Sequence, residues 1–278
     1  MMKSIRTLVR QDREKYVIPR RVQDVIPIQK IWEDGIFLTG GRYAKTFRFT
    51  DINYQVASEP DKEKMFRGYS ALINSLDCGA TTKITIFNHK MSQINFEKSI
   101  LMPMQWDGLD DYREEYNQML LDKATNGNGI VQEKFLTVSV RKKDVDAARS
   151  FFARVEADLS SHFAALGSTC GPMNAMERLQ ILHRFYRRGE ENEFRFSLRD
   201  SARKGHSFRD YICPDSIERH SDYLQIGERY ARVLYLKDYA SYIQDDFVSE
   251  LTDLNRDMML SIDMVPIPTD EAVREVEN

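Results

Sequence analysis

The feature that most constrains the fold is a strand pattern followed at once by a long amphipathic helix pattern. Leu136, Val138 and Val140 alternate with Thr137 and Ser139, which is the period of a β-strand with one buried face. After Asp144, apolar residues recur every three or four positions, the period of an α-helix: Val145, Ala148, Phe152, Val155, Leu159, Phe163 and Leu166. Because each element must bury one apolar face, the pair predicts a sheet covered by helices.

The N-terminal half supplies more elements of these two kinds. The turn Thr39-Gly40-Gly41-Arg42 separates two short strand patterns and has the residues that a β-hairpin uses. The predicted elements are strands at residues 35–38, 43–49 and 81–87, and helices at residues 58–76, 96–101 and 109–123. With the strand and helix described first, their order is ββαβ-αα-βα.

A second group of elements follows the glycine-containing stretch at residues 168–172. Asn174 and Glu177 form a capping box at the start of a helix that is predicted to end near residue 188. Further predictions are strands at residues 194–198, 233–236 and 258–264, a helix at 241–254, and a last helix that begins at residue 269 without a stop signal. Val233, Leu234 and Leu236, with Tyr230 and Tyr235, have the composition of a buried strand.

These patterns predict an α+β fold in which helices pack on one face of mixed sheets, divided into two subdomains. Residues 1–24 are predicted to be a flexible basic N-terminus, although a membrane-surface helix is an alternative. Residues 25–170 form the first predicted subdomain and residues 171–278 the second.

The bulk composition excludes several classes of protein. Forty basic and 43 acidic side chains give a net charge of −3, whereas a dedicated duplex-binding domain carries a clear basic excess. The three cysteines, Cys78, Cys170 and Cys213, are far apart, which favours a reducing compartment and argues against a disulfide framework. With no signal peptide or membrane-spanning run in the sequence, we expect a cytoplasmic protein.

No motif for chemistry stands out in the sequence. The Gly40–Thr46 stretch ends in Lys-Thr, as a phosphate-binding P-loop does, but it lacks the required glycines and continues as a strand pattern. The five histidines lack metal-ligand spacing, and the proximity of Cys213 to His206 specifies no catalytic pair. We therefore predict no catalytic, cofactor-binding or metal-binding residue in this chain.

One stretch has the composition of a binding surface. Aromatic and basic residues interleave in it, and five are predicted protein-docking residues: Phe194, Arg195, Phe208, Arg209 and Tyr211. The same stretch suits a stacking groove of a stand-alone single-stranded nucleic-acid-binding module, in which basic residues interleave with aromatic rings: Arg195, Arg199, Arg203, Lys204 and Arg209 with Phe194, Phe196, Phe208 and Tyr211. Residues 190–229 hold seven basic and nine acidic residues, which weakens this alternative. An enzyme acting on a small molecule is a third hypothesis, supported only by the size of the chain.

Several stretches resemble a known family. They are LNRDMMLSIDMVPIPTDEAVREVEN at the end of the chain, and upstream VIPIQKIWEDGIFLTGGRYAKTFRFTDINY, GATTKITIFN, FFARVEADLSSHF and RKGHSFRDYICPD. They are similar to the N-terminal domain of TrbE/CagE/TraC-type (VirB-family) ATPases of type IV secretion and conjugal transfer. Among these, the ATPases of Gram-positive conjugative transposons are the most similar.

The resemblance implies a non-catalytic assembly domain that precedes a RecA-like motor at the inner face of the cell membrane. Its implied partners are inner-membrane channel proteins and neighbouring ATPase subunits in a homo-oligomer, with no direct metal and no nucleic acid. ATP and Mg²⁺ are implied for the motor, whose Walker motifs this chain lacks. The last predicted helix is then expected to lead into that motor.

Overall fold

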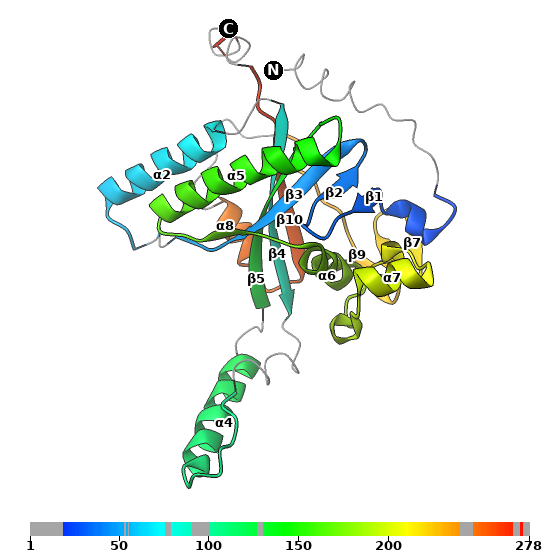
Figure 1. The fold of residues 1–278 in the computed structure, drawn as a ribbon. Coiled ribbons are helices and arrows are strands. Elements are labelled where there is room, and N and C mark those ends of the chain that lie inside the picture. The colour runs from blue at the N-terminus through cyan, green and yellow to red at the C-terminus, as the bar shows by residue number, and fades with distance from the viewer. Residues whose placement is uncertain are drawn as a thin grey trace.

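The computed structural model describes residues 19–52, 54, 56–75, 79–90, 101–126, 130–238, 247–268 and 273–274. The predicted N-terminal segment up to residue 18, nearly all of the helical piece at 96–101 and most of the last helix lie outside these residues. Figure 1 shows a central twisted sheet with helices around it and one helix that projects away from its end.

The main sheet has seven strands in the order β1-β2-β3-β5-β4-β10, with β6 paired to β3. They are β1 (Ile28–Ile31), β2 (Phe37–Thr39), β3 (Arg42–Phe49), β4 (Ala80–Lys90), β5 (Ile130–Val140), β6 (Cys170–Pro172) and β10 (Met258–Met264). β5 is central, because Leu136 lies opposite Phe47 of β3 on one side and opposite Ile84 of β4 on the other.

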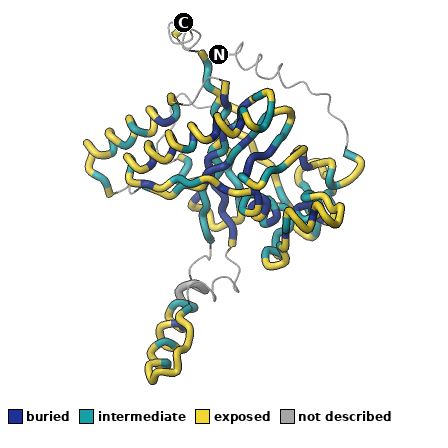
Figure 2. The backbone as a smooth tube through the Cα atoms, in the orientation of Figure 1, coloured by how far each residue is buried: buried dark blue, intermediate teal, exposed yellow. Residues whose placement is uncertain are grey.

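Two helices cover one face of this sheet. They are α5 (Val145–Ala165), whose start is capped by Asp144 accepting a hydrogen bond of 2.8 Å from the Ala147 amide, and α2 (Glu59–Asn74). The predicted apolar stripe of α5 is buried against the sheet in one core cluster, which includes Phe47, Leu72, Leu136, Val138, Phe152, Leu159 and Phe163. Figure 2 shows this burial as the dark segments along the central strands and the inner side of α5.

A third helix, α6 (Ala175–Tyr186), covers the opposite face. It begins with the predicted capping box, in which Asn174 and Glu177 exchange hydrogen bonds of 3.0 and 2.8 Å. Ile181 of α6 packs in a separate cluster with Phe87 and Phe135. Successive strand residues point to opposite faces, so Phe135 contacts α6 while Leu136 contacts α5.

Arg178 ties α6 to the first hairpin from inside the protein. Its NH1 group donates to the carbonyl oxygens of Gly35 and Ala44 at 2.7 and 2.8 Å, and its guanidinium lies 3.8 Å from the centroid of the Phe37 ring. Burial lowers the pKa of Arg178 to about 9. The backbone carbonyls and the aromatic face provide the polar contacts that a buried guanidinium needs.

The remaining elements are short, except for one projecting helix of 17 residues. They are η1 (Val22–Val25), α4 (Asp110–Asn126), η2 (Glu191–Glu193), α7 (Leu198–Lys204), η3 (Phe208–Tyr211), a three-stranded sheet of β7 (Ile217–Arg219), β8 (Leu224–Ile226) and β9 (Arg229–Ala231), and α8 (Phe247–Thr252). No helix in the described part of the chain is both long and apolar enough to cross a membrane.

The predicted α+β class is confirmed, with two corrections in detail. Every strand pairing of the main sheet is antiparallel, so the sheet is not mixed. Helices lie on both faces, because the second face of β4 and β5 also carries large apolar residues that need cover.

Strands from both sides of the predicted subdomain boundary share one sheet, since β6 pairs with β3 and β10 pairs with β4.

The strand predicted at residues 194–198 is wrong. Residues 194–197 are irregular, and α7 begins at Leu198 after Ser197, whose side chain accepts a hydrogen bond of 3.3 Å from the Asp200 amide. Phe194 and Phe196 alternate as strand residues would, but Phe196 belongs to a further apolar cluster and Phe194 packs against it. We call it the cluster beneath α6, and its buried members are Ile26, Ile28, Phe37, Ala175, Leu179, Phe196, Ile212 and Cys213. Burial of the two rings is therefore achieved without a ladder of backbone hydrogen bonds.

Candidate docking surface

The three-stranded sheet ends in an exposed apolar segment. After β9, residues 232–238 have no regular structure, and the side chains of Val233, Leu234, Tyr235 and Leu236 are between 49% and 82% exposed. The buried strand predicted there is wrong. β9 pairs with β8 only as far as Ala231, and beyond it the chain has no ladder partner among the described residues.

Aromatic rings pack on one another at the small sheet, next to this segment in the chain. The ring of Tyr223 stacks on His220 at 4.4 Å and meets the ring of Tyr230 edge-on at 5.5 Å. The side chain of Arg232 donates to the carbonyl oxygen of Asp222 at 3.1 Å, which fixes the start of the segment. We call Tyr223, Tyr230, Val233, Leu234, Tyr235 and Leu236 together the 230s surface. Rigid aromatic and aliphatic groups of this kind, clustered on a protein surface, are typical of protein interfaces.

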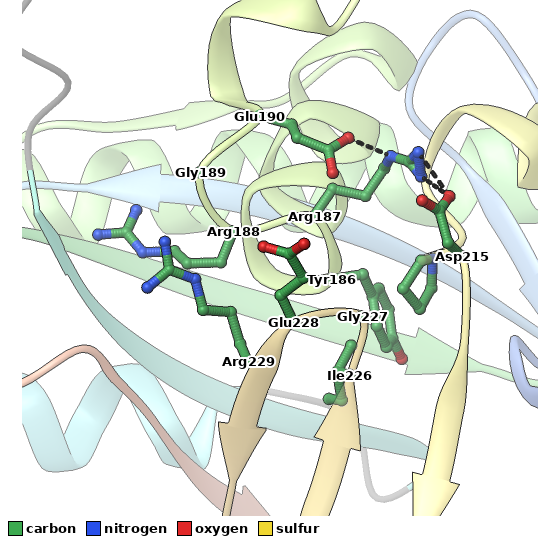
Figure 3. Close-up of a pocket in the computed structure, with 11 residues that line it drawn as sticks. Tyr186, Arg187, Arg188, Gly189, Glu190, Asp215, Ile226, Gly227, Glu228 and Arg229 are labelled. Carbon is green, nitrogen blue, oxygen red and sulfur yellow. Dashed lines mark hydrogen bonds and ion pairs between the residues drawn. The ribbon is translucent and has the colours of Figure 1, made fainter.

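A pocket of about 310 Å³ lies between the end of α6 and the turn from β8 to β9. Three arginines and three carboxylates line it, contributed by residues 187–190, Asp215 and residues 228–229. Their arrangement can be followed in Figure 3. Arg187 makes ion pairs of 2.9 Å with both Glu190 and Asp215, and it also donates to the carbonyl oxygen of Cys213 at 3.1 Å. The guanidinium of Arg187 is therefore engaged in holding the small sheet against α6.

A cluster of charged side chains lies on the α6 face of the sheet. Glu133 of β5 lies 2.6 Å from Arg184, 3.0 Å from His89 and 3.1 Å from Arg48. Burial raises the pKa of Glu133, but the hydrogen bond with His89 and the positive charges of Arg184 and Arg48 outweigh it and lower the pKa to about 2. A carboxylate with so low a pKa is a weak base at neutral pH, so this geometry favours a structural role.

The two described cysteines have protonated thiols at neutral pH. Burial raises the pKa of Cys170 to about 11, and burial also raises the pKa of Cys213, which lies in the cluster beneath α6. A thiol with a raised pKa is a poor nucleophile. Within the described part of the chain, no three His, Cys, Asp or Glu side chains are grouped so as to hold a metal ion.

The Lys-Thr stretch that resembles a P-loop forms the predicted hairpin. Gly40 and Gly41, with φ of 54° and 71°, make the turn between β2 and β3. Thr46 lies inside β3, with its hydroxyl 2.8 Å from that of Thr137. The loop leads into a strand and not into a helix N-terminus, which is the part of a P-loop that binds phosphate.

Four of the five docking residues predicted from the sequence contact the cluster beneath α6. Phe194, Phe208 and Tyr211 pack against this cluster, and the Tyr211 ring meets the buried Phe196 ring at 5.0 Å. Arg209 donates to the carbonyl oxygen of Ile28 at 2.6 Å, while Arg195 is exposed. Four of the five thus contribute to folding, and their docking role stays a prediction.

Sequence reasoning missed the exposed position of the 230s surface, because its apolar run has the composition of a buried strand.

Comparisons with known proteins add no identification: no family model matches the sequence, and no curated protein matches it.

Proposed function

We propose that this chain is a non-catalytic assembly and docking domain of a type IV secretion ATPase that drives conjugative DNA transfer. The sequence resemblance supplies the family, and the observation that carries the docking role is the 230s surface. Leu234 and Tyr235 are about four-fifths exposed (82% and 80%) next to a well-packed body. Several large apolar side chains exposed within one short segment are a feature of surfaces that bind other proteins.

The partners we propose are inner-membrane channel proteins and neighbouring ATPase subunits. The domain would then be cytoplasmic and peripheral at the inner face of the membrane, with ATP and Mg²⁺ bound by the motor. The alternative of a single-stranded nucleic-acid module is less well supported. Its stacking rings, Phe194, Phe196 and Tyr211, pack on one another and on the core, whereas a stacking groove needs open ring faces.

Site-specific photocrosslinking tests this proposal. A photoreactive phenylalanine replaces Tyr235 in cells that carry the secretion apparatus, and the same label replaces Val56, which is 77% exposed, as the matched control. We expect the label at position 235 to crosslink integral membrane subunits of the apparatus or a second ATPase subunit. The proposal is wrong if position 235 crosslinks these proteins no more than position 56 does.

A further inference from the structure

A second apolar surface lies on the projecting helix α4. Residues 101–109 run back along the first half of α4, and we call residues 101–122 the α4 arm. Figure 1 shows α4 beyond the ends of β4 and β5, away from the sheet, and Figure 2 shows it as largely exposed, with some segments of intermediate burial. In the α4 arm, Asn117 is the only buried residue among those described.

Polar contacts hold the two halves of the α4 arm together. The side chain of Asn117 accepts from the amide of Met102 at 2.8 Å and donates to its carbonyl oxygen at 2.9 Å. Asp110 accepts from the amides of Gln105 and Trp106 at 3.0 and 2.9 Å. These contacts hold Trp106 at φ 58°, in the left-handed region that non-glycine residues seldom adopt. The α4 arm is therefore ordered before it binds anything, which lowers the entropic cost of association.

The ordered α4 arm displays its apolar groups to solvent. Leu109, Tyr112, Tyr116 and Met119 are spaced by three, four and three residues, so they share one face of the helix, and all four are exposed. Trp106 is 90% exposed, and Met102 and Met104 are also exposed on the returning segment. Flexible methionines and broad aromatic rings together suit the apolar face of another helix.

Acidic residues lie beside this apolar stripe. With about 100° between successive residues of a helix, Asp111, Glu115 and Asp122 fall along one side of the stripe. The positive charge of Arg113 is engaged by Asp107 and Asp110, to which its NH1 group donates hydrogen bonds. The negative charge beside the stripe attracts a basic partner, and it repels both anionic lipid and nucleic acid.

We propose that the α4 arm binds a basic amphipathic helix of a membrane channel subunit, of the kind that borders the cytoplasmic end of a membrane span. This inference rests on the proposed docking function and names the partner of a second surface. Cytoplasmic segments next to membrane spans carry an excess of Lys and Arg. Such a helix offers an apolar face to Tyr112 and Tyr116 and lysines or arginines to Asp111 and Glu115.

The test uses the full chain and a fluorescent synthetic peptide of about 18 residues, a length that makes five helical turns, with leucine on one face and lysine on the other. Two further peptides serve as controls: one with glutamate in place of lysine, and one in which the leucines and lysines are shuffled out of helical register. We expect binding of the leucine–lysine peptide alone, weakening when salt rises from roughly 50 mM to roughly 300 mM. Equal binding of the lysine and glutamate peptides would overturn the inference, as would binding to anionic vesicles through the α4 arm.

Variants locate the site. Tyr112→Ser combined with Tyr116→Ser is expected to weaken peptide binding roughly 10-fold or more, as loss of central aromatic contacts does. Phe66→Ser on α2, where the side chain is 67% exposed, is the matched control and leaves binding unchanged. Asp111→Lys combined with Glu115→Lys is expected to lose the lysine peptide and to gain the glutamate peptide. This gain cannot arise from unfolding, so a reversed specificity supports the inference and an unchanged one overturns it.

The two proposals fail separately. If the peptide does not bind but position 235 crosslinks channel proteins, the inference about the α4 arm is wrong and the docking function stands. If the peptide binds with the expected specificity but position 235 finds no partner in the apparatus, the α4 arm binds basic helices and the assignment of the 230s surface is wrong.

Discussion

Arg184 of α6 lies 2.6 Å from Glu133 of β5, and this ion pair anchors the helix to the face of the sheet that α5 does not cover. Both side chains are about 85% removed from solvent, with 15% and 16% exposed. His89 and Arg48 complete the partners of the carboxylate. Because Glu133 serves three cationic or hydrogen-bonding groups at once, its loss affects β3, β4 and α6 together.

Glu133→Gln tests this cluster. The amide keeps the shape of the side chain but leaves Arg184 and Arg48 without their counter-charge. We expect the free energy of unfolding to fall by about 2–4 kcal/mol, near the cost of breaking a buried ion pair by removing one partner. Urea denaturation measures this change. Glu115→Gln on the exposed side of α4 is the control, with an expected change within about 0.5 kcal/mol. A loss as small for Glu133→Gln as for the control would contradict the structural role.

The same cluster predicts how stability depends on pH. The pKa of Glu133 is about 2 in the folded protein, against an ordinary value of 4.5, so the unfolded chain binds the proton more readily. The stabilisation is therefore present above about pH 4.5 and is lost as the pH falls towards about 2. Urea denaturation at several pH values should show that the difference in free energy of unfolding between wild type and Glu133→Gln decreases over this range. A difference that is constant with pH would show that the charge of Glu133 is not its source.

Gly35 and Gly41 form a matched pair for testing a close contact. Both have positive φ, of 80° and 71°, so alanine is strained at either position. A Cβ at Gly35 would lie 1.9 Å from the carbonyl oxygen of Met173, whereas a Cβ at Gly41 meets nothing within 4 Å. We expect Gly41→Ala to cost about 1 kcal/mol from backbone strain, and Gly35→Ala to cost at least about 3 kcal/mol because strain and a backbone clash add. Thermal and urea denaturation measure both changes, and equal losses would contradict the packing of Gly35 against Met173.

Much of the main sheet could be predicted from the sequence, because the apolar periods of its strands and of α5 mark faces that are buried. The alternation of Met258, Leu260, Ile262 and Met264 predicted β10, and the apolar stripe after Asp144 predicted α5. Phe194 with Phe196 and the run from Val233 to Leu236 were misleading. A period of two, or a run of apolar residues, describes where side chains lie and does not supply a neighbouring strand to complete the ladder.

The polar sites were harder to predict than the elements. Glu133, His89 and Arg184 come from β5, β4 and α6, and no local spacing connects them. The stripe from Leu109 to Met119 has the period of a buried helix face, and only the structure places it in solvent. Sequence period identifies an apolar face; it does not say whether the partner of that face lies in the same chain.

ATP provides a test of the proposed absence of motor chemistry. The sequence has no GxxxxGK[ST] motif, and the Lys45-Thr46 pair continues a strand. We expect the isolated chain to release no phosphate from ATP with Mg²⁺ above the rate of a heat-denatured control. A coupled phosphate-release assay measures this rate. Turnover that is lost in a Lys45→Ala variant would show that these residues bind nucleotide after all.

The pairing of β10 with β4 predicts the behaviour of fragments. Met258–Met264 pairs with β4 along seven residues, from Asn88 to Thr82, and α6 covers Phe87 and Phe135. A fragment of residues 1–170 lacks both, so it leaves β4 as an open edge and two large rings uncovered. We expect this fragment to bind a hydrophobic dye and to unfold without a cooperative transition, while residues 1–268 unfold cooperatively. Leu234→Ser in the longer chain is the control. Because the Leu234 side chain is already 82% exposed, we expect this substitution to change the free energy of unfolding by no more than about 0.5 kcal/mol.

Cooperative unfolding of residues 1–170, with a stability within about 1 kcal/mol of the longer chain, would instead establish the first predicted subdomain as an independent folding unit.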